Sequence, residues 1–430
     1  MVHAVPRKGY DWAIGEPPPT LEAHSLAKHE VLRRYLLAYV AVLTSNPKVE
    51  HFRLTLVDGF AGGGAYISRG GASLSGSPLI MLDAMREASV AAQALRTKQG
   101  FHLDVEYFFI ERKAQAFAYL CNVLKERGFR PNDKRSHIHA INGDFIEHAE
   151  TIIQSIKSRG RARRAIFLLD QYGYSEVPLS LIRYILTSLP HAEVIITIAA
   201  DWLFDYMQDS RSFRETLLRS GLSEVESSLD DILVAKNTPA WRRLAQSALS
   251  DDLARGSGAS FYTPFFIASE ASTRDYWLVH LSMHARARDE MTKLHWALKN
   301  TFQHYGRSGL HMLGYAPSED PAVTGQASFA FDDAAASATQ DALMEDIPKA
   351  IASLEHDGTS FQSFFESVCN HTPASREHVG DVVRALGRLG EIELTDKDGK
   401  PRRGGARVLE TDLVRPARQL FLDRGRKWRT

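Results

Sequence analysis

Four carboxylates in the first half of the sequence, Asp58, Glu111, Asp144 and Asp170, each follow a run of mainly apolar residues. The first of them opens a glycine-rich turn, where Asp58 could accept a hydrogen bond from a bound cationic or amino group. Glycines expose bare backbone and adopt angles that other residues avoid, which leaves room for a nucleoside. The turn residues predicted to contact such a ligand are Gly59, Phe60, Ala61, Gly62 and Gly64.

The three later acids suit other parts of a nucleoside and its reaction partner. Glu111 could receive ribose hydroxyls, because one carboxylate accepts two hydrogen bonds at once. Asp144 could accept from the exocyclic amine of adenine, with Phe145 beside the ring. Asp170 could orient a second substrate together with the side chains that follow it, Gln171, Tyr172 and Tyr174. A helix N-cap or a solvated loop end is the alternative for each acid alone.

Strands and helices alternate around these acids at a spacing typical of βαβ units. Apolar runs predict strands at 52–57, 105–110, 137–141, 165–169 and 193–199. Helical patterns are found at 21–43, from 77 onward, and at 113–127, 145–156 and 178–189. Open α/β sheets bind ligands where their parallel strands end. The sequence therefore predicts an α/β, Rossmann-like parallel sheet that carries the four acids along its carboxyl edge.

The remaining segments predict an insertion and a second domain. Residues 1–20 are rich in Pro and Gly and predict a flexible N-terminus, followed by the sheet domain at 21–315. A helical insertion is predicted at about 201–260, before a strand pair (261–268 and 276–283) and a helix at 290–302. The composition of 316–340 is that of a linker. Residues 341–430 predict three helices and a hairpin with its return strand at 406–409, which is the order of a winged helix.

Basic residues gather in this predicted winged-helix domain. Arg376, Arg384 and Arg388 lie on the helix that would enter a nucleic-acid groove. The predicted wing carries Lys400, Arg402 and Arg403, which could contact phosphates. This pattern favours DNA or RNA as a partner. A solvated basic surface, or a winged helix that contacts protein, is the alternative.

Composition narrows the functional classes. The formal net charge is zero, so any nucleic-acid surface must be local. The two cysteines, Cys121 and Cys369, form no CxxC pair, which argues against a disulfide framework and a cysteine zinc site. No metal site is predicted. The sequence shows no apolar run typical of a signal peptide or a membrane span, and we expect a cytoplasmic protein.

The segment Asp58-Gly59-Phe60-Ala61-Gly62-Gly63-Gly64 resembles the S-adenosylmethionine (SAM) turn of class I methyltransferases, especially those that act on nucleic-acid bases. From about residue 20 to 310, and loosely beyond, the sequence is similar to the three-Cys-motif partner (TcmP) family. The segments that carry this similarity are His24-Ser25-Leu26-Ala27-Lys28-His29, Val57-Asp58-Gly59-Phe60-Ala61-Gly62, Gly76-Ser77-Pro78-Leu79, Ile110-Glu111 and Asp170-x-Tyr172-Gly173. The resemblance implies a class I methyltransferase-like fold, SAM as cofactor, and a bacterial protein encoded beside a radical-SAM-like protein that bears a three-cysteine motif.

Two departures from these patterns bear on catalysis. Adenine amino-methyltransferases carry Asp/Asn-Pro-Pro-Tyr after the fourth strand, and the TcmP family tends to carry Asp-Pro-aromatic-Gly. This chain has Asp170-Gln171-Tyr172-Gly173-Tyr174, which keeps the acid and the aromatic residues but lacks the prolines. The second departure is a long Gly/Ser loop at 65–76, which could act as a lid or displace the cofactor.

Two functional hypotheses follow. The first is a SAM-dependent methyltransferase that acts on DNA or RNA, at an exocyclic amine of a base. The second is a catalytically reduced methyltransferase fold that serves as a partner or nucleic-acid adaptor of the three-cysteine protein. A nicotinamide dehydrogenase is disfavoured, because the turn lacks GxGxxG spacing before an immediate helix.

Overall fold

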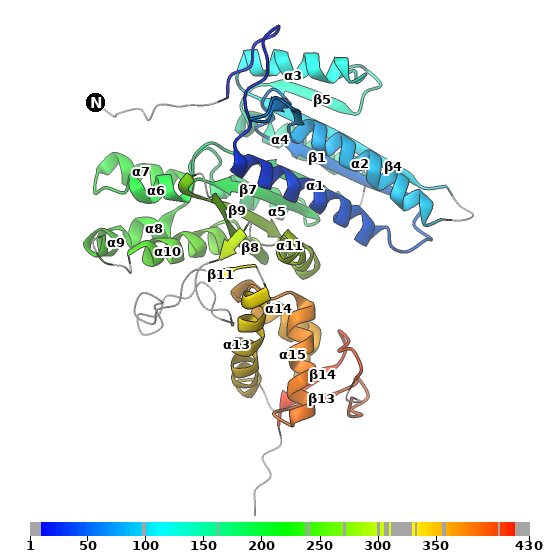
Figure 1. Cartoon of the computed structure of the whole chain (residues 1–430), viewed down its shortest axis with the longest axis vertical. Coiled ribbons are helices and arrows are strands. Elements are labelled where there is room, and N and C mark those ends of the chain that lie inside the picture. Colours follow the sequence, from blue (N-terminus) through cyan, green and yellow to red (C-terminus); the bar gives the residue numbers. More distant parts are fainter. Residues whose placement is uncertain are drawn as a thin grey trace, which may run out of the picture. The chain divides into compact units, whose positions relative to one another are not determined.

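The computed structural model describes residues 10–96, 100–160, 163–236, 238, 241–269, 272–298, 302–304, 309–310, 329–331, 333–354, 358–402 and 405–417. The chain divides into two compact units (Figure 1). Unit 1 contains Met1–His304 and Tyr315–Phe331, and unit 2 contains Tyr305–Gly314 and Asp332–Thr430.

Within the described residues, unit 1 is built on a nine-stranded sheet in the order β11-β10-β8-β9-β7-β6-β1-β4-β5. Its strands are β1 (His51–Asp58), β4 (His102–Glu111), β5 (Ile138–Asn142), β6 (Ala165–Leu169), β7 (Ala192–Ile198), β8 (Phe261–Ser269), β9 (Ser272–Ser282), β10 (Phe302–His304) and β11 (Phe329–Ala330). Five of them, β5, β4, β1, β6 and β7, are parallel, and β9 lies antiparallel between β7 and β8. The predicted Rossmann-like parallel sheet is confirmed.

Helices cover both faces of this sheet (Figure 1). They are α1 (Ala23–Leu43), α2 (Ser77–Ala94), α3 (Ala114–Glu126), α4 (Phe145–Ser158), α5 (Leu179–Ser188) and α11 (Ala285–Leu298). Helices α1, α2, α3 and α11 share one core cluster with Ile166 and Leu168 of β6. Between these two residues, Phe167 meets the ring of Phe145 in α4. Because successive strand residues point to opposite faces, α4 packs on the other face from α1.

The segment between β7 and β8 is helical. Its helices are α6 (Ala200–Asp205), α7 (Arg211–Ser220), α8 (Ser223–Ser227), α9 (Leu229–Ala235) and α10 (Trp241–Gly256). Helix α11 begins at Ala285, five residues before the predicted start at 290, and Ala285, Arg288 and Asp289 in this extra stretch are buried. No helix in the described ranges is long and apolar enough to cross a membrane.

Two segments of unit 1 that were predicted to lack regular structure contain a hairpin or contact one. The loop at 65–76 contains a hairpin of β2 (Ala65–Ile67) and β3 (Ser73–Ser75), so it is not a plain Gly/Ser loop. The N-terminus was predicted to be flexible to residue 20, but Trp12 is buried and Tyr10 packs against Tyr66. Thr20 also bridges to Ile67. The segment 10–20 therefore contacts this hairpin through Tyr10, Trp12 and Thr20. Residues 1–9 lie outside the described residues.

Unit 2 has the element order of a winged helix. Its elements are α13 (Asp333–Ala352), β12 (Thr359–Ser360), α14 (Phe361–Val368), the 3-10 helix η2 (Cys369–His371), α15 (Arg376–Leu389), β13 (Ile392–Thr395) and β14 (Leu413–Pro416). The strands form a sheet in the order β12-β14-β13. Helix α15 begins with a capping box between Ser375 and His378 and ends at Gly390, which adopts a left-handed conformation.

Two boundaries in this half of the chain differ from the prediction. Helix α13 begins at Asp333, inside the predicted linker 316–340, because its Ala-rich start favours helix and its aspartate suits a first turn. Residues 316–328 lie outside the described residues. The return strand is β14, not 406–409, because Val414 is the buried residue that pairs with Leu394 of β13.

Candidate functional site

A pocket of about 220 Å³ lies at the carboxyl edge of the parallel strands. Its wall includes a residue at the end of each of β1, β4, β5 and β6: Gly59, Glu111, Gly143 and Asp170. The predicted site residues that line it are Gly59, Phe60, Gly62, Glu111, Asp144, Phe145, Asp170, Gln171 and Tyr172. The predicted residues that are not part of this wall are Asp58, Ala61, Gly64 and Tyr174.

Asp58 lies beneath the glycine-rich turn. Its side chain is fully buried, and its Oδ1 accepts a hydrogen bond from the N–H of Phe60 at 3.1 Å. Burial raises the pKa of Asp58 to about 7, because the charged form loses its solvation. Asp58 thus shapes the turn from below, whereas the sequence predicted a direct contact with a ligand.

Trp12 covers the same turn. A Cβ atom on Gly62 would lie 2.9 Å from the Trp12 ring, and one on Gly63 would lie 2.4 Å from it. The indole N–H of Trp12 donates to the carbonyl of Ala65 at 2.9 Å. The bare backbone that the sequence assigned to a nucleoside is therefore in contact with an indole ring of the same chain. The φ of Gly62 is +58°, which also favours glycine there.

Glu111 links the end of β4 to the glycine-rich turn. Its Oε2 accepts from the N–H of Gly62 at 2.9 Å, and its Oε1 accepts from the N–H of Lys113 at 2.6 Å. Each carboxylate oxygen has a second lone pair. The carboxylate is thus fixed at the pocket wall and can still accept from a bound hydroxyl.

Asp144 is the N-cap of α4. Its Oδ1 accepts from the N–H of Ile146 at 3.0 Å, so the helix-cap alternative is realised at this position. Its Oδ2 lies 3.6 Å from Nη1 of Arg112, and Nη2 of the same guanidinium lies 3.9 Å from Oε2 of Glu176. Asp144 still lines the pocket, beside Phe145. The cap and the ion pair hold its carboxylate in place.

Asp170 forms an ion pair with Lys28 of α1. The Lys28 ammonium donates to both carboxylate oxygens, at 2.6 and 2.7 Å. Burial opposes ionisation of Asp170, but the Lys28 charge outweighs it and holds the pKa of Asp170 below its usual value. Asp170 is therefore an anion at neutral pH. We did not assign Lys28 a role from the sequence, although it lies in the His24–His29 segment that resembles the TcmP family.

The three residues predicted to follow Asp170 in the site have different surroundings. Gln171 is buried, and its Oε1 accepts from the N–H groups of Glu176 and Val177 at 3.0 and 2.9 Å. The amide oxygen of Gln171 therefore stabilises the loop, whereas the sequence predicts that this side chain helps to orient a second substrate. Tyr172 is 49% exposed at the pocket, and burial of its remainder raises its pKa to about 12. Tyr174 is half-buried outside the pocket wall.

Two histidines of α1 complete the wall beside Lys28. The ring of His24 stacks on Tyr276 of β9, with centroids 4.5 Å apart. Burial, helped by the Lys28 charge, lowers the pKa of His29 to about 4, so its imidazole is neutral at pH 7. Neither histidine was predicted to lie in a site. Both lie near the start of α1, which is far from most of the other pocket residues in the sequence and meets them only when the chain folds.

Among the Asp, Glu, Lys and Arg side chains of the wall, acidic residues are in excess. The carboxylates are Glu22, Glu111, Asp144, Asp170 and Glu176, and the cations are Lys28, Arg112 and Lys113. With all of them ionised the wall has an excess of two negative charges. This excess favours a ligand that carries positive charge.

The predicted nucleic-acid contacts of unit 2 are partly used within the unit. Arg402 donates to both oxygens of buried Asp412, at 2.8 and 2.6 Å. Arg376 pairs with Glu410 at 2.6 Å, and Arg384 pairs with Asp381 at 2.7 Å. The exposed predicted residues are Arg388 and Lys400. Arg403 lies outside the described residues.

The chain thus combines a mostly parallel α/β sheet that resembles the methyltransferase fold, with antiparallel β9 between β7 and β8, and a winged-helix domain in unit 2. The family model described as a GMT-like winged helix-turn-helix (wHTH) domain matches residues 314–399. No curated protein matches the sequence.

Among solved structures, the chain is similar to the DszA carbon methyltransferase, with 13% identity and a TM-score of 0.30 over 61% of this chain and 56% of that chain. It thus spans little more than half of the DszA chain. A protein assigned as a sarcosine dimethylglycine methyltransferase from Galdieria sulphuraria matches with 13% identity and a TM-score of 0.23, over 64% of this chain and 95% of that one. Loganic acid methyltransferase with SAH matches with 10% identity and a TM-score of 0.23, over 64% and 84%.

Proposed function

We propose that the protein is a SAM-dependent methyltransferase that acts on a nucleic acid, at an exocyclic amine of a base. The observation that carries the proposal is the convergence of Glu111, Asp144 and Asp170 on one pocket beside the glycine-rich turn. In an α/β sheet of this type the carboxyl edge is the place where ligands bind. The winged helix of unit 2 supports nucleic acid as the substrate class.

The residues of the wall fit SAM by their chemistry. SAM carries a sulfonium and an amino group, and the acidic excess of the wall favours such a cation. Glu111 would receive the ribose hydroxyls, and Asp144 would accept from the adenine amine with Phe145 beside the ring. When bound, SAM supplies an electrophilic methyl group.

The acceptor would lie at the end of β6. Asp170 stays ionised beside Lys28, so it would accept a hydrogen bond from the acceptor amine and aim the nitrogen lone pair. Half-exposed Tyr172 offers a ring on which an extruded base could stack. Positioning of this kind supplies most of the rate, because it turns a bimolecular encounter into a local one.

Isothermal titration with SAM, followed by transfer of labelled methyl from SAM to DNA and RNA, tests the proposal. The Asp170→Ala variant should bind SAM and lose transfer by at least about a hundredfold, the usual cost of removing one oriented electrostatic contact. Tyr174→Phe is the matched control, since Tyr174 is not part of the pocket wall. Absence of SAM binding at millimolar concentration, or full activity of Asp170→Ala, would contradict the assignment.

A second candidate function rests on the contact of Trp12 with Gly62 and Gly63 and on the missing prolines after Asp170. Here the chain is a catalytically reduced partner that binds nucleic acid together with the three-cysteine radical-SAM-like protein of a bacterial cytoplasm, as the TcmP resemblance suggests. Co-purification of a stable complex without methyl transfer would favour this function. Failure of the two proteins to associate in a pull-down would count against it.

A further inference from the structure

A second hollow lies at the opposite, amino edge of the same sheet. It has a volume of about 570 Å³ and lies where β1 and β4 begin and just before β6. A neighbouring hollow of about 340 Å³ shares Arg53, Asp104, Arg159 and Gly160 with it, so the two hollows adjoin; we call them together the groove. The ionisable residues of the groove are His51, Arg53, His102, Asp104, Arg159, Arg163 and Arg164.

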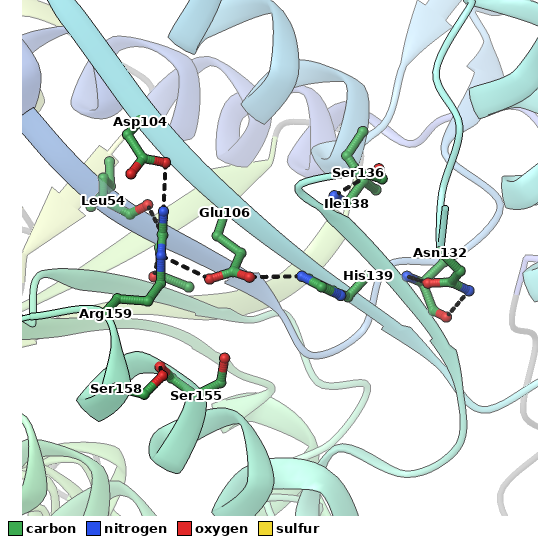
Figure 2. A network of polar contacts seen from close by, with 12 residues as sticks. Leu54, Asp104, Glu106, Asn132, Ser136, Ile138, His139, Ser155, Ser158 and Arg159 are labelled. Atoms are coloured by element: carbon green, nitrogen blue, oxygen red, sulfur yellow. Dashed lines mark hydrogen bonds and ion pairs between the residues drawn. The ribbon is translucent and has the colours of Figure 1, made fainter. Parts of the chain in front are cut away.

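Leu54, Asp104 and Arg159, which line this groove, belong to a network of polar contacts (Figure 2). The Arg159 guanidinium contacts Asp104 at 2.6 Å and Glu106 at 3.0 Å, and it also donates to the carbonyl of Leu54 at 3.2 Å. Glu106 in turn contacts His139 of β5 at 2.8 Å. Arg159 is therefore satisfied by its own chain and acts as a structural part of the groove.

Arg53 and Arg163 are exposed to solvent, whereas Arg164 is half-buried. The Arg53 side chain is 64% exposed and contacts Asp104 at 3.2 Å. Arg163 is exposed, and the Arg164 guanidinium lies 5.5 Å from the centre of the Phe52 ring. Among the described residues neither Arg163 nor Arg164 forms an ion pair with a carboxylate. The groove is thus lined by four arginines and one carboxylate, Asp104, which contacts Arg53 and Arg159. Its charge stays positive even when Glu106 is also counted.

We propose that this groove binds the phosphodiester backbone of a nucleic acid. The identity of the polymer rests on the proposed function; the groove itself rests on its shape and charge. Arginine suits phosphate because its planar fork donates two parallel hydrogen bonds. Two adjoining open hollows lined by several arginines fit successive phosphates of a polymer better than one isolated phosphate.

The position of the groove sets a length for the polymer. Residues of β1 advance about 3.3 Å each, so its eight residues separate the amino-edge groove from the carboxyl-edge pocket by about 25 Å. Phosphates of one strand recur about every 3.4 Å along a duplex, so about seven base pairs span this separation. Because β1 is buried in the core, a nucleic acid must pass round the outside of unit 1, so about seven base pairs is the minimum length that could reach both places.

The test compares full-length wild-type protein with the double variant Arg163→Gln/Arg164→Gln. The probes are a labelled DNA duplex of about two helical turns and a single-stranded RNA of the same sequence, titrated by fluorescence anisotropy at several salt concentrations. The variant should bind at least about tenfold more weakly, because charge-assisted hydrogen bonds are lost. The slope of log affinity against log salt should fall by about 1.8 for the duplex or about 1.4 for the single strand.

The matched control is Arg211→Gln/Arg219→Gln, which makes the same charge change on exposed positions of α7. Circular dichroism checks that each variant is folded. Weakening confined to the groove variant supports the proposal, and the probe with the larger loss identifies the polymer. Wild-type affinity in the groove variant, equal weakening in the control, or no binding of either probe by the wild type would overturn it. Failure of SAM titration or methyl transfer would overturn the proposed function and leave this binding result intact.

Discussion

The pocket of unit 1 and the wing of unit 2 each contain an ion pair in which a cation donates to both carboxylate oxygens of an aspartate. Lys28 contacts Asp170 at 2.6 and 2.7 Å, and Arg402 contacts Asp412 at 2.8 and 2.6 Å. Their surroundings differ. Asp412 is 1% exposed, whereas the Asp170 side chain is 29% exposed on a pocket wall. The same pair is therefore buried in the wing and leaves a partly exposed charge on the pocket wall of unit 1.

Asp58 gives the limiting case of this comparison, a buried carboxyl group that forms no ion pair within the described residues. Its pKa is raised from 3.8 to about 7, so the folded state holds a proton that the unfolded state releases. The contribution of Asp58 to stability should therefore be greatest below about pH 4 and fall as pH rises to about 7, by about 4 kcal/mol at most. Urea unfolding followed by tryptophan fluorescence measures this trend. Asp58→Asn should remove it, and an unchanged slope in that variant would assign it to other groups.

Arg402→Gln should show the structural role of the wing pair. It leaves the carboxylate of Asp412 buried without its cation, which we expect to destabilise unit 2 by about 3 kcal/mol. Faster hydrogen exchange in β13 and β14 would report this loss. Arg388→Gln, an exposed change on α15, is the control and should leave exchange unchanged. Equal exchange in Arg402→Gln and wild type would mean that the wing does not depend on the pair.

The pocket pair should cost less to break, because solvent in the pocket reaches Asp170. We expect Asp170→Asn to lower the stability of unit 1 by about 2 kcal/mol, less than a fully buried pair. The double variant Lys28→Met/Asp170→Asn should recover part of this loss, because it removes the unpaired ammonium. Unfolding curves of the single and double variants give the coupling energy. A loss as large as that of Arg402→Gln would make the two pairs equivalent and weaken the distinction between them.

The two regions also differ in how far the sequence predicts them. The ends of parallel strands must meet at one edge, so the positions of Glu111, Asp144 and Asp170 along the chain predict their convergence. No such rule applies to the wing. Arg402 was predicted to be free for phosphate, but its partner Asp412 lies beyond a turn whose course depends on the fold. The pairing of Lys28 with Asp170 was not predicted for the same reason: 142 residues separate the two, and only the fold brings them together.

Trp12 was not predicted to lie at the site. Glycines in a turn can make room for a ligand or for another part of the same chain, and here the Trp12 ring lies against Gly62 and Gly63. The φ of Gly63 is not in the left-handed region, so Gly63→Ala is strained only by the Trp12 ring, 2.4 Å from the new Cβ. We expect a loss of about 1 kcal/mol, at the low end for overpacking, because residues 10–20 can shift outward. In the Trp12→Ala background the same substitution should cost almost nothing, and the double-mutant cycle isolates this contact. An equal cost in both backgrounds would show that the glycine is required by the turn alone. A loss of stability that disappears in the Trp12→Ala background would show that the N-terminal segment closes over the place where a nucleoside is expected. SAM should then bind faster to the Trp12→Ala variant than to the wild type.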